Sequence, residues 1–156
     1  GAPINVYDAS SDILTKTTRD DNNKDRLENG NYVETCGNHY VLLVTEQGDA
    51  TPALITMKAT QLKKSRKWNS MLLNLKLNGK NGLFTPPSYS HYYRLKTTKE
   101  GNDKGNWWGW EVSRESQLED ANLYSIAKAF AESVNKGEVK VKYEEESSTS
   151  EQKVPF

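Results

Sequence analysis

The chain has 156 residues, with 21 basic and 21 acidic side chains and a net charge of zero at pH 7. This length fits one domain with a core, and no apolar run approaches the roughly 20 residues that a membrane span requires. A single cysteine, Cys36, excludes an internal disulfide and suits a reducing compartment. We therefore expect a soluble intracellular protein without membrane contacts.

The charge is distributed unevenly along the chain. Residues 50–99 carry ten basic and no acidic side chains, a net charge of +10, whereas residues 1–49 carry −5. Residues 100–137 carry −3 and residues 138–156 carry −2. Such segregation indicates a polyanionic partner, although a basic face that is merely solvated would have the same composition.

The first third of the chain predicts a polar loop followed by strands. Residues 15–30 are crowded with Asp, Asn, Lys and Arg and predict a flexible loop. Residues 31–36, 39–46 and 53–57 are rich in Tyr, Val, Leu and Ile, which is typical of strands. The segment at residues 47–49 predicts the turn between the last two of these strands.

A helix is predicted from Thr60 onward. Trp68, Met71, Leu72 and Leu75 recur at helical spacings and form one apolar stripe. The helix should therefore pack through Trp68. Its four basic residues fall on the arc beside that stripe and give the helix a basic edge: Lys63, Lys64, Arg66 and Lys67.

A loop, a hairpin and a second helix complete the element order. Residues 78–90 contain two glycines and a Pro-Pro pair, so they predict a loop. Residues 91–98 and 106–113 predict two strands joined by a seven-residue polar connection with a flexible tip. Ser116 and Glu119 match a capping box and predict the start of the second helix, and Gly137 predicts its end.

The fold class predicted by this order is mainly β with α. Three strands, a helix and two strands match an OB-like five-stranded barrel with a helix between strands 3 and 4, here with an appended C-terminal helix. A mixed α+β sandwich of the same elements is the alternative. We predict a single nucleic-acid-binding domain over residues 1–143 and a disordered acidic tail over residues 144–156.

Aromatic residues are interleaved with the basic ones over residues 50–110, which hold more than half of the aromatic side chains. Cations neutralise phosphates and flat rings stack on unpaired bases, so the combination favours binding of single-stranded nucleic acid. The loop at residues 83–91 could act as a lid carrying Tyr89, or be an ordinary loop anchor. The predicted nucleic-acid contacts are Trp107, Tyr92, Arg94, Lys96, Lys63, Lys64, Arg66, Lys67, Tyr89, Trp108 and Trp110.

Strand alternation orders these candidates. Tyr92, Arg94 and Lys96 share one face of their strand, which we expect to be wet and cationic. In the partner strand, core packing should claim Trp108 and Trp110. Trp107 would then remain free beside a glycine, and it is the first candidate for stacking on a base together with Tyr92. Burial of all the tryptophans in the core is the alternative.

Two resemblances to known families add to this interpretation. The acidic C-terminal segment ends in Val154-Pro155-Phe156 and resembles the tails with terminal Ile-Pro-Phe of bacterial single-stranded DNA-binding proteins. Residues 53–69, 92–95 and 102–110 resemble small tailed-phage proteins of the single-stranded DNA-binding type, a similarity that covers residues 32–140. It implies a role in phage DNA replication or recombination in the cytoplasm of an infected bacterium. The tail would contact replication or recombination proteins, unless it is a featureless disordered terminus.

Catalysis has little support in the sequence. The basic half has no carboxylates to hold the cations of a nuclease, and Cys36 with His39 lacks further zinc ligands except His91. We therefore expect no enzyme activity, no metal and no cofactor. A phage virion or assembly component, with the basic aromatic face against protein or packaged genome, is the leading alternative, and an RNA-binding regulator is another. Homo-oligomers would suit strand coating or assembly equally.

Overall fold

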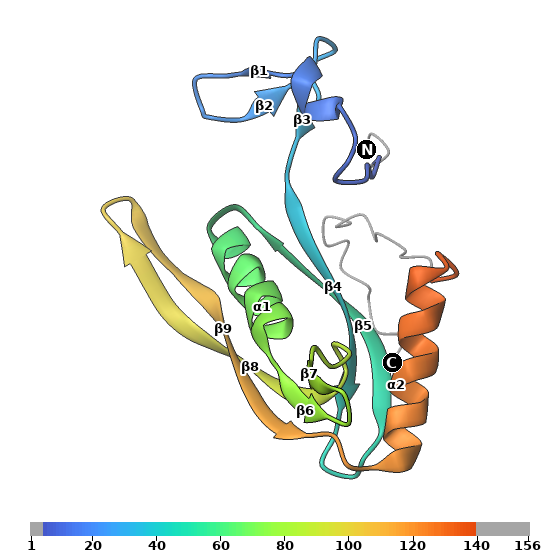
Figure 1. The fold of residues 1–156 in the computed structure, drawn as a ribbon. Coiled ribbons are helices and arrows are strands. Elements are labelled where there is room, and N and C mark those ends of the chain that lie inside the picture. The colour runs from blue at the N-terminus through green and yellow to red at the C-terminus, as the bar shows by residue number, and fades with distance from the viewer. Residues whose placement is uncertain (1–4, 140–156) are drawn as a thin grey trace, which may run out of the picture. The chain divides into compact units, whose positions relative to one another are not determined.

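The computed structural model describes residues 5–139 (Figure 1). These residues fall into two compact units, one ending at Val33 and the other beginning at Glu34. Neither α-helix in this part of the chain is long and apolar enough to cross a membrane. The single domain over residues 1–143 stays a prediction.

The first unit contains a 3-10 helix, η1 (Ile13–Lys16), and a small antiparallel sheet. Its strands are β1 (Thr18–Arg19), β2 (Asp25–Arg26) and β3 (Tyr32–Val33), in that order. The ion pair between Arg19 and Asp25, 3.0 Å, joins β1 to β2. The segment predicted as a loop therefore contains short strands, because polar cross-strand pairs replace an apolar core there.

The first hairpin of the second unit consists of β4 (Cys36–Val44) and β5 (Ala50–Lys58), paired over nine positions. The predicted turn lies between them, where Gly48 adopts φ +87°. The strands predicted at residues 31–36 and 39–46 are differently divided: β3 belongs to the first unit and β4 begins already at Cys36. Gly37 lies within β4. Because it has no side chain, the buried Ser65 side chain can approach the strand closely there.

The predicted first helix forms as α1 (Leu62–Asn74) after a 3-10 turn, η2 (Ala59–Gln61). Trp68 is buried and anchors α1 as the apolar stripe predicted. A short hairpin, β6 (Leu77–Gly79) with β7 (Gly82–Phe84), follows where a loop was expected.

The second long hairpin consists of β8 (His91–Asn102) and β9 (Gly105–Gln117). The predicted seven-residue tip is wrong, because both strands continue to a two-residue turn at Asp103-Lys104. Asn102 stabilises this turn by accepting a hydrogen bond from the backbone of Lys104, 2.8 Å.

The last helix is α2 (Ala121–Asn135). Its N-cap is Asp120, whose carboxylate accepts from the backbone N–H of Leu123 at 2.9 Å. The capping box predicted at Ser116 and Glu119 is wrong, because β9 extends through residue 117. The helix ends at the predicted glycine, Gly137, which has φ +70°.

The fold is mainly β with two α-helices and several small antiparallel sheets, which confirms the predicted class at this level. The β4–β5 and β8–β9 hairpins are separate two-stranded sheets, and the described residues form no closed barrel. Helix α1 lies between the two hairpins and contacts β4, β5 and β9 (Figure 1). The apolar core is small: Met57, Trp68, Leu123 and Ala127.

Candidate functional site

The basic edge of α1 is present but not uniform. Lys63, Arg66 and Lys67 are exposed. None of these three side chains forms an ion pair with the described residues. Lys64 instead turns toward β8 and forms an ion pair of 2.6 Å with Glu100. Three of the four predicted helix cations are therefore available to a phosphate, and the fourth is used inside the fold.

Glu100 is the centre of a polar network that joins α1 to the β8–β9 hairpin. Its carboxylate accepts hydrogen bonds from the indole Nε1 of Trp107, 3.0 Å, and from the side-chain amide of Gln61, 3.3 Å. The bond from Lys64 is the main reason that the pKa of Glu100 falls to about 2. Gln61 also accepts from the backbone N–H of Trp110, 2.8 Å. The network attaches the helix start to the edge of β9.

The three tryptophans of β9 have different environments. Trp107 and the buried Gly109 are on the face with the Glu100 network, where a Cβ at position 109 would collide with the Glu100 carboxylate. Trp108 points the other way and is 69% exposed. Its partner across the hairpin is Lys99. Trp108 is therefore the indole best placed to stack on a base.

This arrangement corrects the predicted order of the tryptophans. The assignment of Trp108 to the core is wrong, and Trp107 is half-buried and hydrogen-bonded instead of free. Alternation along the strand was predicted correctly, but the contact of Trp107 with Glu100 beside the start of α1 was not. The glycine beside Trp107 accommodates the Glu100 carboxylate and the Gln61 amide, not a base.

The predicted cationic face of β8 is exposed, but its charges are matched by acids. Arg94 pairs with Glu115 at 3.0 Å, and Lys96 pairs with Glu111 at 3.6 Å. Both acids lie on β9, which follows the stretch without carboxylates. A phosphate that approached Arg94 or Lys96 would have to compete with these partners.

The remaining aromatic candidates lie along a groove in the second unit. Tyr92 and Trp110 are half-buried and line it, as does Tyr89, whose ring packs edge-on against Tyr124 at a centroid distance of 5.4 Å. The structure thus separates the predicted contacts into an exposed group near Trp108 and α1 and a half-buried group along the groove.

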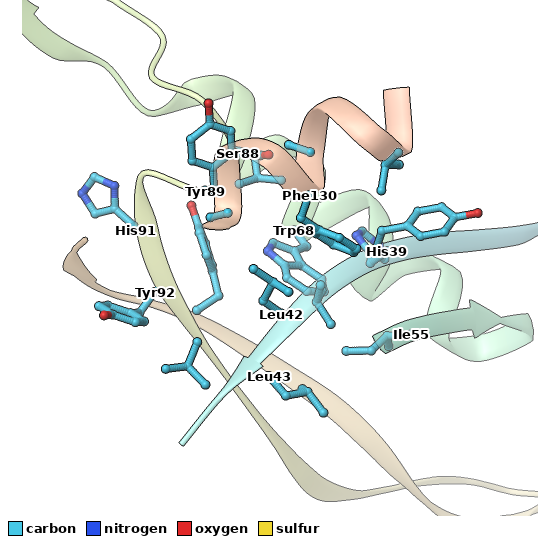
Figure 2. A pocket seen from close by; sticks show the side chains of 18 of the residues that line it. His39, Leu42, Leu43, Ile55, Trp68, Ser88, Tyr89, His91, Tyr92 and Phe130 are labelled. Carbon is cyan, nitrogen blue, oxygen red and sulfur yellow. The ribbon is translucent and has the colours of Figure 1, made fainter. Parts of the chain in front are cut away.

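The groove has a volume of about 680 Å³ and is lined mainly by β4, the start of β8 and α2. None of its lining residues is Lys, Arg, Asp or Glu. Figure 2 shows Trp68, Phe130 and Leu42 among the residues that line it. Sequence patterns did not reveal this groove, because its wall combines residues that are distant along the chain.

His39 forms part of the same wall. Its ring stacks on Trp68 with centroids 4.3 Å apart, and its Nε2 is 2.8 Å from Oγ of the buried Ser65. Burial lowers the pKa of His39, which favours the neutral ring. The described residues contain no cluster of three or more His, Cys, Asp or Glu that could hold a metal. His39 therefore acts here as a packing residue.

A comparison with protein families identifies the family of this chain. The family described as Pam3 phage gp34-like protein matches residues 1–140. The chain belongs to this family, and it is a phage protein. No curated protein and no solved structure matches it. The predicted partner-binding residues Val154, Pro155 and Phe156 lie outside the described residues.

Proposed function

We propose that this phage protein binds single-stranded DNA without sequence preference. The observation that carries the proposal is the 69% exposed indole of Trp108, which stands opposite Lys99 on a hairpin attached to a basic helix. An exposed ring can stack on any base, and a neighbouring cation can neutralise the adjoining phosphate. Exposing an indole of this size to water is otherwise unfavourable.

The hairpin supports this role because it is held in place. The Glu100 network fixes β8 and β9 against α1 through Lys64, Gln61 and Trp107. Stacking on a side chain that is already ordered loses less conformational entropy than stacking on a mobile one. In this proposal Trp107 holds the hairpin in place, and Trp108 stacks on the base.

The phosphate contacts are proposed to be Lys99 and the exposed cations of α1. Lys99 lies beside Trp108, whereas Lys63, Arg66 and Lys67 lie on the helix whose start contacts the opposite face of the hairpin through Glu100. A strand stacked on Trp108 would therefore have to cross the hairpin to reach the start of α1. Contacts of this kind carry no sequence information, which agrees with binding that is indifferent to sequence.

The finer predictions belong to the same proposal. An OB-like barrel would require pairing between the β4–β5 and β8–β9 hairpins, and the proposed contacts do not depend on it. A binding protein with these properties would protect displaced strands during phage replication or recombination in the host cytoplasm. The C-terminal tail would then contact replication or recombination proteins.

The test is a titration of the full chain with unlabelled oligo-dT, followed by tryptophan fluorescence at two salt concentrations and compared with a duplex of equal length. Trp108→Ala should weaken binding by about 5- to 150-fold, corresponding to the ~1–3 kcal/mol of one stacked base. The matched control is Trp107→Phe, which removes the hydrogen bond to Glu100 and keeps a ring. It should retain the affinity.

Two outcomes would contradict the proposal. Loss of affinity in Trp107→Phe but not in Trp108→Ala would move the contact to the face that α1 covers. Absence of any fluorescence response to single strands, at both salt concentrations, would favour the other candidate function.

That second candidate is a phage virion or assembly component. The uncharged groove favours it, because an apolar groove with no charged lining is more typical of a protein contact than of a phosphate path. Under this hypothesis Trp108 would belong to a subunit interface. Association of the protein with itself or with other virion proteins, without binding of single strands, would support it.

A further inference from the structure

One edge of strand β4 has no partner strand in the part of the chain that the structure describes. Among the described strands it pairs with β5 alone. Seven consecutive residues, 38–44, line the groove, although successive side chains point to opposite faces of a strand. Figure 2 shows Leu42 and Leu43 projecting to opposite sides of β4. The groove therefore runs along the edge of β4 that pairs with no described strand, and the backbone N–H and C=O groups of such an edge can pair with an added strand.

The sequence of β4 requires a cover on both sides. Residues 40–44 are Tyr-Val-Leu-Leu-Val, a continuous apolar run, whereas a two-stranded sheet with one wet face should alternate apolar and polar residues. Tyr40 is 38% exposed, Leu43 54% and Val44 39%. Exposed apolar side chains next to an open strand edge mark a site for strand addition.

The occupant of the groove should be an extended segment without charge. Strands β8 and β9 carry several charged side chains, β6 and β7 have only three residues each, and β1, β2 and β3 have only two residues each. Strand β5 has Pro52, which has no N–H to donate to a ladder. Strand β4 has nine residues, no Lys, Arg, Asp or Glu, and no proline. The chain itself thus contains the one described strand that fits the groove.

We propose that two copies of this chain associate through antiparallel pairing of their β4 edges. Each β4 would lie in the groove of the other copy, and the two hairpins would form a four-stranded sheet in the order β5, β4, β4, β5. A contact of this kind is isologous and closes after two copies, as most homodimers do. It would also end the exposure of the β4 edge. The inference does not depend on DNA binding.

The first test is sedimentation velocity of the full chain over a range of concentrations, with reductant present to keep Cys36 reduced. The wild type should sediment as a dimer, twice the 17.7 kDa of one chain. Leu43→Lys should sediment at half that mass, because it places a charge in an uncharged interface. Leu43 is half exposed in the single chain, so this variant should fold, which circular dichroism can verify.

The matched control is Leu83→Lys. Leu83 lies on β7, is 70% exposed and is not part of the groove lining. This variant should remain a dimer. A wild type that stays monomeric at all concentrations would overturn the proposal and assign the groove to a different protein. A dimer that survives Leu43→Lys would overturn it as well, because the contact would lie elsewhere.

A second test locates the contact on β4. In a Cys36→Ser background, single cysteines at positions 40, 41, 42 and 43 should form intermolecular disulfides under mild oxidation, with the yield highest at positions near the two-fold axis. Cysteines directly opposite each other across non-hydrogen-bonded pairs come closest. A dimer without a disulfide at any of the four positions would contradict the proposed pairing. Trp108→Ala should remain dimeric, so this result separates association from DNA binding.

Discussion

Two regions of the second unit, the surface around α1 and the groove beside β4, differ in the chemistry of the groups they leave available for a ligand. Around α1 and the outer part of β8–β9, three basic side chains form ion pairs, yet the exposed indole of Trp108 and four exposed cations have no acidic partner among the described residues: Lys63, Arg66, Lys67 and Lys99. Along the groove no lining residue is Lys, Arg, Asp or Glu, and one edge of the apolar strand β4 pairs with none of the described strands. We propose a polyanion as the partner of the first region and an apolar strand as the partner of the second. One small unit can therefore have two partners of different chemistry.

The largest expected effect is on the core that both regions share. Trp68 packs against His39 and Tyr93 and is 5% exposed. Trp68→Ala should lower the free energy of unfolding by about 3–5 kcal/mol, because apolar burial is reduced and a cavity forms. Chemical denaturation followed by circular dichroism measures this. Trp108→Ala is the control, and we expect a change within ~0.5 kcal/mol because its ring is exposed. Equal destabilisation of both variants would show that Trp108 is also packed.

The next prediction tests the two regions separately, by measuring both DNA binding and self-association for a variant of each region. Trp108→Ala should lose affinity for oligo-dT and keep the mass of the wild type in sedimentation. Leu43→Lys should lose self-association. At protein concentrations where the monomer is the species that binds DNA, this variant should keep the quenching of its tryptophan fluorescence by oligo-dT. Loss of both properties in either variant would mean that the two surfaces act as one.

A smaller effect is expected from the cations of α1 that have no acidic partner among the described residues. Replacing Lys63, Arg66 and Lys67 by Gln should reduce the salt dependence of binding, with the slope falling by about 0.7 for each phosphate of a single strand that is no longer neutralised. The control replaces Arg94 and Lys96, which already pair with acids. It should alter the slope less. The opposite order would assign the phosphate path to β8.

The smallest effect concerns acid stability of the charged region. The pKa of Glu100 lies at about 2, below its usual 4.5, chiefly because of the hydrogen bond from Lys64. A depressed carboxyl pKa contributes stability above the unfolded pKa, and this contribution is lost as the pH falls through the folded value. Glu100→Gln should therefore be less stable than wild type at neutral pH, with a difference that shrinks between pH 4.5 and pH 2. Parallel stability curves would show that Glu100 adds nothing through its charge.

Local patterns predicted the elements well where neighbours along the chain decide them. The helical spacing of Trp68, Met71 and Leu72 predicted α1 and its buried face. The turn before β5 and the end of α2 at Gly137 were also predicted, because each depends on a glycine with positive φ. Element boundaries were less accurate: the hairpin turn at residues 103–104 and the N-cap Asp120 were missed. Both lie in polar segments where several residues could cap or turn.

The site was predicted in composition and not in arrangement. The basic stretch and its aromatic residues were visible in the sequence, and so was the alternation of Trp107 and Trp108. Which of these two indoles faces solvent was not, because that depends on the docking of α1 through Lys64 and Glu100, which are 36 positions apart. The groove escaped detection for the same reason.

By itself, the sequence determined the mainly β class, the two amphipathic helices, the charge segregation and the membership of a phage family. These properties follow from local periodicity and composition, which can be read directly from the order of the residues. Tertiary structure alone decided that Trp108 is exposed, that Glu100 pairs with Lys64, and that a groove without Lys, Arg, Asp or Glu borders the edge of β4 that pairs with no described strand. Each of these depends on which surfaces meet when distant segments pack, and the free energy of that packing is not contained in any single segment.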